Sequence, residues 1–323
     1  MALFARSRTS PLVVTWRTYE PSDFDDYVAY LGEANRDTPD FAPIEGPAAM
    51  ERVLLQAPSY RRNGHFLALD GGRIVADAVA MDRPRRGGRL GFVQWNALAG
   101  QGDEATFDGL LGRCLAYLSG KVTEVRLLLR PEHAAARGVL TARGLAPTGS
   151  LSRFAGSATR TRSGRAVRAM RLEDVETVAA ILTRAYEDDP LFSLVAIEGP
   201  FGMAILRDAA SGACFVAERD DRPVGVVGIG ARGDVGFVDF LAVDPDYRRT
   251  GIGSSLLSTA LFWMSQRGCA RGLAVADPAN EAAAEFYRRF GFAATEPEHR
   301  VVYGTPPREG APADSTEAGL GRV

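Results

Sequence analysis

The chain has 323 residues, 46% of them hydrophobic and 24% charged, enough to build one large globular domain or two ordinary ones. Its formal net charge of -2 gives no reason to expect nucleic acid or an acidic membrane surface as a partner. Cys114, Cys214 and Cys269 are widely spaced and odd in number, which argues against a disulfide framework and indicates a reducing, cytoplasmic setting.

Other features of the composition exclude further classes. No apolar run approaches the length of a membrane span, and the first residues lack the pattern of a secretory signal. The three histidines are scattered without a ligand spacing, so we expect no metal site.

The sequence repeats one plan after about 150 residues. Residues 17–41 and 168–192 share eight of 25 positions without a gap, and further similar segments follow in the same order in both halves. This pattern indicates a duplicated domain. We expect domains at 12–154 and 167–305, a linker at 155–166 rich in Ser, Thr, Gly and Arg, and a disordered tail at 306–323.

The elements are clearest in the second half. The periodicity predicts a helix over about 173–186, two strands joined by a polar turn at 219–222, and a longer strand at 236–243. A helix over 252–267, a strand at 269–276 and a helix over 280–290 follow. Two short strands, "FAAT" and "HRVVYG", complete a mixed sheet flanked by helices, and the repeat predicts the same series in the first half.

The stretch "DPDYRRTGIGSSLL" (244–257) links the longer strand to the following helix. A helix start exposes unpaired N–H groups and carries a partial positive charge, and glycine removes the Cβ that would keep an anion away. Gly251, Gly253, Arg248 and Arg249 therefore predict a cradle for a phosphate or diphosphate. The motif is neither a Walker loop nor a dinucleotide fingerprint, and for an isolated Gly-x-Gly a plain strand-to-helix turn is the favoured interpretation.

Two motifs together resemble the GNAT acetyltransferase superfamily. "LAVDPDYRRTGIG" matches its cofactor signature Leu-x-Val-x-Pro-x-x-Arg-x-x-Gly-x-Gly at every fixed position. "NEAAAEFYRRFGF" matches the second signature through Asn280, Ala283, Phe286, Tyr287, Gly291 and Phe292. The resemblance implies two tandem GNAT-like domains, each an α/β domain with a mixed central β-sheet flanked by helices, in a layout similar to that of mycothiol synthase. No acceptor-specific residue supports that particular activity.

The resemblance implies that acetyl-CoA is the acyl donor. Its diphosphate would be held by the turn, and its pantetheine arm would pair with the strand before it. An amide near Leu241 to Val243 would polarise the thioester carbonyl. The implied cofactor-binding residues are Leu241, Ala242, Val243, Arg248, Arg249, Thr250, Gly251, Ile252, Gly253, Ser254 and Asn280. For Asn280, a helix N-cap is an alternative that is compatible with cofactor binding.

Two residues are candidates for catalysis. Tyr287 matches the family's general acid, and the alternative is simple packing beside Phe286 and Phe290. Asp239, the single charged residue of "GFVDFLAV", is the candidate base, on the same strand face as Val243. A paired or solvated strand aspartate is an equal alternative for Asp239. Glu187, Asp188 and Asp189 would attract a cationic amine or form a solvated helix end.

The first half lacks both motifs. Aligned from the helix, Glu104 and Thr106 stand at the positions of Gly251 and Gly253, and the connection is two residues shorter. His133 replaces Asn280 and Leu140 replaces Tyr287. We therefore expect a degenerate copy without activity.

The sequence thus predicts a cytoplasmic N-acetyltransferase whose second half acts on a primary amine of a small or amino-acid-like molecule. A protein or peptide N-acetyltransferase and a non-catalytic acyl-CoA sensor are the alternatives. The acceptor is left open because fold does not fix substrate. The oligomeric state is equally open between monomer and homodimer.

Overall fold

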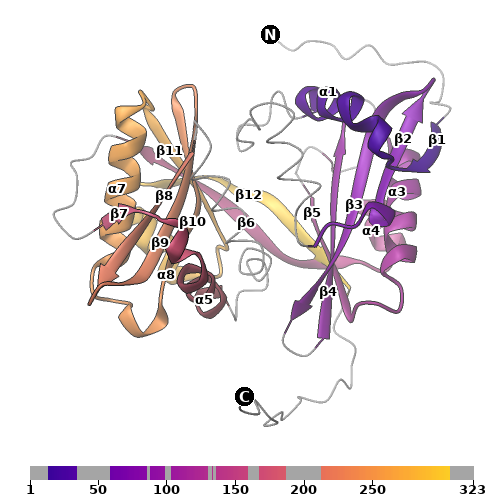
Figure 1. The fold of residues 1–323 in the computed structure, drawn as a ribbon. Coiled ribbons are helices and arrows are strands. Elements are labelled where there is room, and N and C mark those ends of the chain that lie inside the picture. Colours follow the sequence, from indigo (N-terminus) through magenta and orange to yellow (C-terminus); the bar gives the residue numbers. More distant parts are fainter. Residues whose placement is uncertain are drawn as a thin grey trace.

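The computed structural model describes residues 14–34, 59–85, 88–98, 103–129, 133, 136–158, 167–186 and 212–305. These residues form two α/β halves that share one continuous mixed sheet (Figure 1). The expected linker beyond Ala158, the tail at 306–323 and the acids Glu187, Asp188 and Asp189 lie outside the described residues.

The two halves repeat the same series of elements, as the sequence predicts. The first half contains β1 (Val14–Thr18), α1 (Phe24–Ala34), β2 (His65–Asp70), β3 (Arg73–Arg85), β4 (Gly88–Ala97), α3 (Glu104–Leu118), β5 (Glu124–Leu129), α4 (Ala136–Ala142) and β6 (Ala146–Ser157). The second contains β7 (Val167–Ala169), α5 (Val175–Tyr186), β8 (Gly212–Arg219), β9 (Arg222–Arg232), β10 (Val235–Val243), α7 (Ile252–Gln266), β11 (Arg271–Ala276), α8 (Glu281–Arg289) and β12 (Ala293–Gly304).

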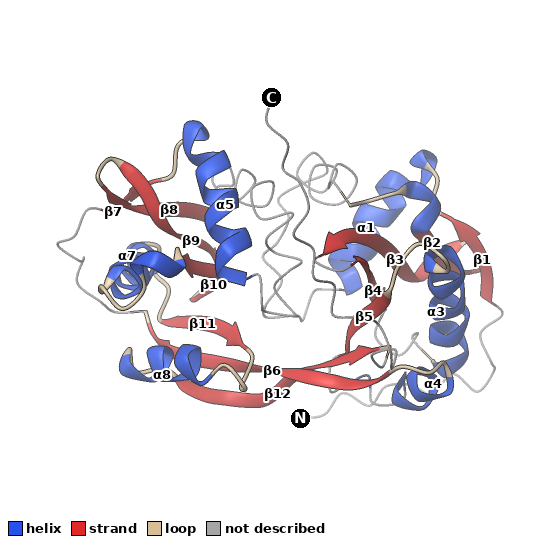
Figure 2. Ribbon diagram, turned by 90° about the horizontal axis from the view of Figure 1, so that it is seen from below, coloured by secondary structure: helices blue, strands red, loops and turns tan. Residues whose placement is uncertain are grey.

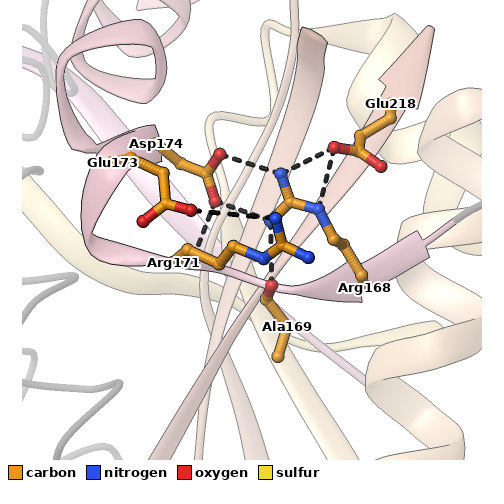
Figure 3. Close-up of polar contacts among 6 residues, drawn as sticks. All are labelled: Arg168, Ala169, Arg171, Glu173, Asp174 and Glu218. Carbon is orange, nitrogen blue, oxygen red and sulfur yellow. Dashed lines mark hydrogen bonds and ion pairs between the residues drawn. The ribbon is translucent and has the colours of Figure 1, made fainter. Parts of the chain in front are cut away.

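One ion pair occurs in both halves at the corner between the first strand and the first helix. Arg168 donates to both carboxylate oxygens of Asp174, at 2.6 and 2.9 Å, and Asp174 also accepts from the backbone N–H of Arg171 (Figure 3). Arg17 and Asp23 form the same pair. The arginine holds the pKa of each carboxyl below its usual value. Two of the eight shared positions therefore have one structural role, which supports a duplication.

The halves exchange their last strands. The sheet order is β1-β2-β3-β4-β5-β12-β6-β11-β10-β9-β8-β7, so β12 of the second half lies beside β5 of the first, and β6 of the first half lies beside β11 of the second. Figure 2 shows β6 and β12 running together from one half to the other. Each half is completed by a strand whose sequence belongs to the other half.

The register shows where each strand crosses over. The end of β6, residues 152–157, pairs with the whole of β11, from Ala276 back to Arg271. The end of β12, residues 301–304, pairs with β5 between Leu129 and Arg126. The segments "FAAT" and "HRVVYG", expected as two strands, form one strand with register shifts, because its two ends serve different halves.

The crossing bears on the expected linker. β6 continues to Ser157, and Ala158 donates to the carbonyl of Ala270, so 155–158 belong to the sheet. The first residues of the expected linker therefore form part of the second half's sheet. The division into two domains with boundaries at 154 and 167 stays a proposal, since each half of the sheet is complete only with a strand from the other half.

Helices cover both faces of the sheet in the second half. α7 and α8 pack on one face through Leu256, Leu257, Ala260, Leu261 and Ala284, which are buried with Val227, Val238 and Ala274 of the strands. α5 packs on the other face, where Val178, Ile181 and Leu182 contact Val216, Val226 and Phe240. The apolar stripes of the helices thus bury both faces of β8 to β10.

The strand exchange predicts that the halves are inseparable under native conditions. After proteolysis at a site inserted between residues 159 and 166, the two fragments should co-elute in size-exclusion chromatography, because β6 and β12 stay paired across the cut. Fragment 167–323 made alone should be unfolded by circular dichroism, because β11 would lose β6. Fragments that separate without denaturant, or a folded 167–323, would contradict the exchange.

Candidate active site

A cleft opens where two neighbouring strands of the second half separate. β10 and β11 run parallel and pair only from Val235–Arg271 to Val238–Ala274. Beyond that point β10 stays with β9, and β11 stays with β6. The cleft between them has a volume of about 1310 Å³, bounded by β10 and the start of α7 on one side and by the end of β11 and α8 on the other. Beyond the separation, one edge of β10 has no partner among the described strands.

A β-bulge marks the point of separation. Val238 pairs with Ile229 and Phe240 with Gly228, so Asp239 is an extra residue in β10. Its side chain is exposed and lines the cleft. Desolvation by the surrounding protein raises the pKa of Asp239 to about 7. Because water still reaches the carboxyl through the open cleft, we expect the full shift only when a ligand fills the cleft.

The turn after β10 forms the mouth of the cleft. Arg249 and Gly251 both have left-handed backbone conformations, with φ of 64° and 85°. Gly251 is the N-cap of α7 and provides no side-chain cap, and the N–H of Ser255 is bonded to its carbonyl. The backbone N–H groups of Ile252, Gly253 and Ser254 belong to the uncapped first turn, where the helix provides no carbonyl acceptor for them. They form the expected anion cradle.

Packing alone does not require glycine at position 253. A Cβ there would meet only ordinary contacts, the nearest being the ring of Phe286 at 3.5 Å and Val243 at 3.6 Å. Gly253, Val243 and Phe286 all line the cleft, and the missing Cβ leaves space there, so the residues present fit a phosphate group at the helix start.

Arginine side chains brace the turn. Arg248 donates to the carbonyls of Val243 and Ala185, at 3.3 and 3.1 Å, and so ties the end of α5 to the end of β10. Arg184 of α5 pairs with Asp244 and Asp246 in the turn, each at 2.8 Å. Arg248, expected as a cation for the phosphate, therefore also fixes the geometry of the cradle.

Tyr287 lies in the opposite wall. Its side chain is 7% exposed and packs among Phe154, Phe286 and Phe292, with ring centroids 5.4 to 5.7 Å away. Burial raises the pKa of Tyr287 to about 12. Among the described residues its hydroxyl has no hydrogen-bond partner, and Tyr287 lines the cleft. A protonated phenol is thus available to a ligand there.

Asn280 has the expected cap geometry. Its side-chain oxygen accepts from the N–H of Ala283 at 3.0 Å at the start of α8. Asn280 also lines the cleft, and the cap uses only its oxygen, which leaves the amide nitrogen as a donor.

Comparisons with known proteins agree with this geometry. The sequence profile of the Acetyltransferase (GNAT) family matches residues 176–292. The matched segment covers most of the second half of the chain and contains both motifs. Mycothiol acetyltransferase of Cellulomonas flavigena is 34% identical over 113 residues, a match that spans 32% of this chain and 32% of that protein.

Solved structures show the same fold over nearly the whole chain. A GCN5-related N-acetyltransferase from Sphaerobacter thermophilus is 17% identical, with a TM-score of 0.60 over 94% of this chain and 99% of that one. A tandem GNAT protein from the clavulanic acid biosynthesis pathway is 11% identical, with a TM-score of 0.59 over 90% and 98%. The tandem layout of GNAT-like halves is therefore confirmed as a fold.

Nearly all residues expected from the GNAT motifs gather in the cleft. The lining contains Asp239, Leu241, Ala242, Val243, Arg248, Arg249, Gly251, Ile252, Gly253, Ser254, Asn280 and Tyr287. Thr250 is the exception, since its hydroxyl donates to the carbonyl of Tyr247 within the turn. No cluster of the described residues is suited to a metal ion, and no described helix is long and apolar enough to cross a membrane.

In the first half the corresponding cleft is filled with aromatic side chains. Trp95 packs against Phe107 at 4.7 Å and against His133 at 5.6 Å. The helix start is capped by Asp103, whose carboxylate accepts from the N–H of Thr106. This carboxylate occupies one of the first-turn amides, that of Thr106, whereas Gly251 provides no side-chain cap in the second half.

The buried stripes of α3 and α7 correct the sequence alignment. Leu110, Leu111, Cys114 and Leu118 correspond to Leu256, Leu257, Ala260 and Met264 at a constant offset of 146 residues. Leu118 and Met264 each cover a strand glycine, Gly91 or Gly236. Ala105 and Phe107, rather than Glu104 and Thr106, therefore stand at the positions of Gly251 and Gly253.

The same comparison explains the difference in length. Gly91 and Gly236 differ by 145 residues, and the offset becomes 146 after the bulge. β4 pairs with β3 in constant register, so the first half has no counterpart of Asp239. Between the strand glycine and the buried stripe of the following helix, the halves differ by this one residue, so the expected two-residue shortening of the connection was wrong. The expected alignment of Leu140 with Tyr287 agrees with the structure. The N–H of Leu145 donates to the carbonyl of Leu140, as the N–H of Phe292 does to the carbonyl of Tyr287.

Sequence reasoning missed Tyr186. Its hydroxyl donates to the carbonyl of Leu241 at 3.0 Å, on the strand expected to bind the pantetheine arm. Its place at the end of α5, before the acidic residues 187–189, was the available signal.

The raised pKa of Asp239 predicts a pH-dependent stability difference. The folded protein favours the neutral acid, so Asp239 stabilises the fold below its unfolded pKa of about 4, and this contribution is lost as the pH rises above that value toward about 7. The loss should be larger with CoA in the cleft than without it, because the ligand excludes water from the carboxyl. Relative to Asp239→Asn, the wild type should lose Tm between about pH 4 and pH 8 in thermal scans. Parallel Tm curves would show that the carboxyl is fully hydrated.

Proposed function

We propose that the chain is an acetyl-CoA-dependent N-acetyltransferase whose second half transfers the acetyl group to a primary amine of a small or amino-acid-like molecule. The observation that carries the proposal is one cleft with three parts in sequence: an uncapped helix start, an unpaired strand edge and a buried phenol. These parts suit the diphosphate, the pantetheine arm and the thioester of acetyl-CoA in that order.

The donor would bind along β10. The amides of Ile252, Gly253 and Ser254 would hold the diphosphate, with Arg249 adding charge at the mouth. The pantetheine amides would pair with the free edge at Leu241 to Val243, as an added strand does. At Leu241 they meet a carbonyl already bonded to Tyr186, so this contact must be shared or displaced.

The chemistry is aminolysis of a thioester. The neutral amine attacks the carbonyl carbon, and a backbone N–H of β10 stabilises the oxyanion of the tetrahedral intermediate. The C–S bond then breaks, the amine nitrogen loses one proton and the CoA sulfur gains one. Asp239, with its pKa near 7, accepts the proton from nitrogen directly or through water.

Tyr287 would act on the leaving group. With a pKa of about 12 it stays protonated throughout the working pH range. A thiol has a pKa of about 8.5, so complete transfer from the phenol to the thiolate is uphill. Its main effect is therefore a hydrogen bond that stabilises the developing thiolate, and the final proton on sulfur comes from the proton released by the amine.

Two other functions remain as alternatives. The curated relative is named mycothiol acetyltransferase, which suggests a small-molecule acceptor, but the match covers only a third of that protein, and no described residue selects one acceptor. A protein or peptide N-acetyltransferase would use the same donor site. A non-catalytic sensor would bind acyl-CoA without releasing CoA.

Donor binding is tested by Gly253→Ala. The new Cβ has room within the protein but occupies the cradle, so Tm should hold while affinity for CoA falls by about tenfold or more in calorimetry. Gly138→Ala, a helical glycine in the first half with open space around it, is the matched control. Wild type should bind one CoA per chain, because Phe107 fills the other cradle. Equal affinity in Gly253→Ala would refute the cradle.

Catalysis is tested with acetyl-CoA, a panel of small amines and a panel of peptides, by measuring released thiol. Tyr287→Phe should keep CoA affinity and lower kcat by ~10²-fold. Asp239→Asn should remove the rise of kcat/KM through about pH 7. Small amines as best substrates support the leading proposal, and peptides support the alternative enzyme. Binding of CoA without turnover of any amine would indicate a sensor.

A further inference from the structure

The exchanged strand β6 brings a first-half side chain into contact with Tyr287, behind the residues that line the cleft. Phe154 is 2% exposed and lies in the second half's core, between Ala274 of β11 and Ala294 of β12. Its ring stacks on that of Tyr287, with centroids 5.7 Å apart and planes 27° apart. Tyr287 of the second half is thus in contact with a residue that belongs to the sequence of the first half.

The other aromatic neighbours of Tyr287 contact it differently. Phe286 meets the ring edge-on at 66°, and Phe292 is tilted at 48°. Among these three, only Phe154 lies nearly parallel to the phenol ring, so a rotation of the phenol about its side-chain bonds would change this contact. The ring of Phe292 depends on β6 as well, since a Cβ at Gly156 would lie 2.6 Å from it.

A small displacement of the phenol matters because a hydrogen bond to a leaving group weakens steeply with distance and angle. A side chain without a hydrogen-bond partner among the described residues depends on packing for its position. We propose that Phe154, carried into the second half by β6, is a positioning residue that holds Tyr287 for its role in acyl transfer. This inference rests on the proposed function.

The decisive test is a double-mutant cycle in the full chain. Phe154→Leu should lower kcat by about tenfold and leave KM for acetyl-CoA within about twofold, because the donor cradle lies elsewhere in the cleft. In the Tyr287→Phe background the same change should cost almost nothing, since its effect is exerted through the hydroxyl. Additive losses in the double variant would overturn the inference.

Two further variants separate positioning from loss of stability. Leu151→Ala removes a buried side chain from the same strand, away from Tyr287, and should lower Tm without the kcat effect. Gly156→Ala pushes on Phe292 and should lower kcat as Phe154→Leu does. It replaces Phe154→Leu in the cycle if that variant does not fold. A kcat loss in Leu151→Ala equal to that of Phe154→Leu would show a general effect of instability.

A titration tests the same contact without turnover. The phenolate absorbance assigned to Tyr287, as the difference between each protein and its Tyr287→Phe partner, should appear at lower pH in Phe154→Leu, because water reaches the ring more easily. An unchanged titration would overturn the inference. If wild type acetylates no amine, the proposed function fails, and the titration still decides whether Phe154 encloses Tyr287.

Discussion

The pairing of β6 with β11, and of β12 with β5, is the constraint on which the rest of the structure depends. Where β10 and β11 separate, β11 loses a partner on one side, and β6 supplies its partner on the other. The cleft can open because that second edge is occupied. The first half is therefore needed for the shape of the site, although none of its described residues lines the cleft.

The two halves share a framework and differ at their clefts. The ion pairs Arg17–Asp23 and Arg168–Asp174 fix the same corner in both. At the strand separation, Trp95, Phe107 and His133 stand where the second half has Leu241, Gly253 and Asn280. Large rings fill the space in one copy, and small or polar residues leave it open in the other.

Motifs made much of the second half predictable, because each combines a strand end, a helix start and a spacing that only one local structure satisfies. The helix over 252–267, the cap at Asn280 and the burial of Tyr287 agree with the structure. Strand partners were not predictable, since the alternation of "HRVVYG" defines its two faces but not that it lies beside β5. The sequence alone did not reveal the bulge at Asp239, nor that Phe107 stands at the position of Gly253. Both became clear only when the buried residues of α3 were aligned with those of α7.

The extra residue in β10 has a consequence for how such a site is lost. Without Asp239, Val238 would still lie opposite Ile229 and Phe240 opposite Gly228, as consecutive pairs of a regular ladder. Deleting Asp239 would therefore straighten β10 into the ladder that β4 already has, and would remove both the bend and the carboxylate from the cleft. One inserted or deleted residue is therefore enough to separate a strand that receives a ligand from a strand that only completes a sheet.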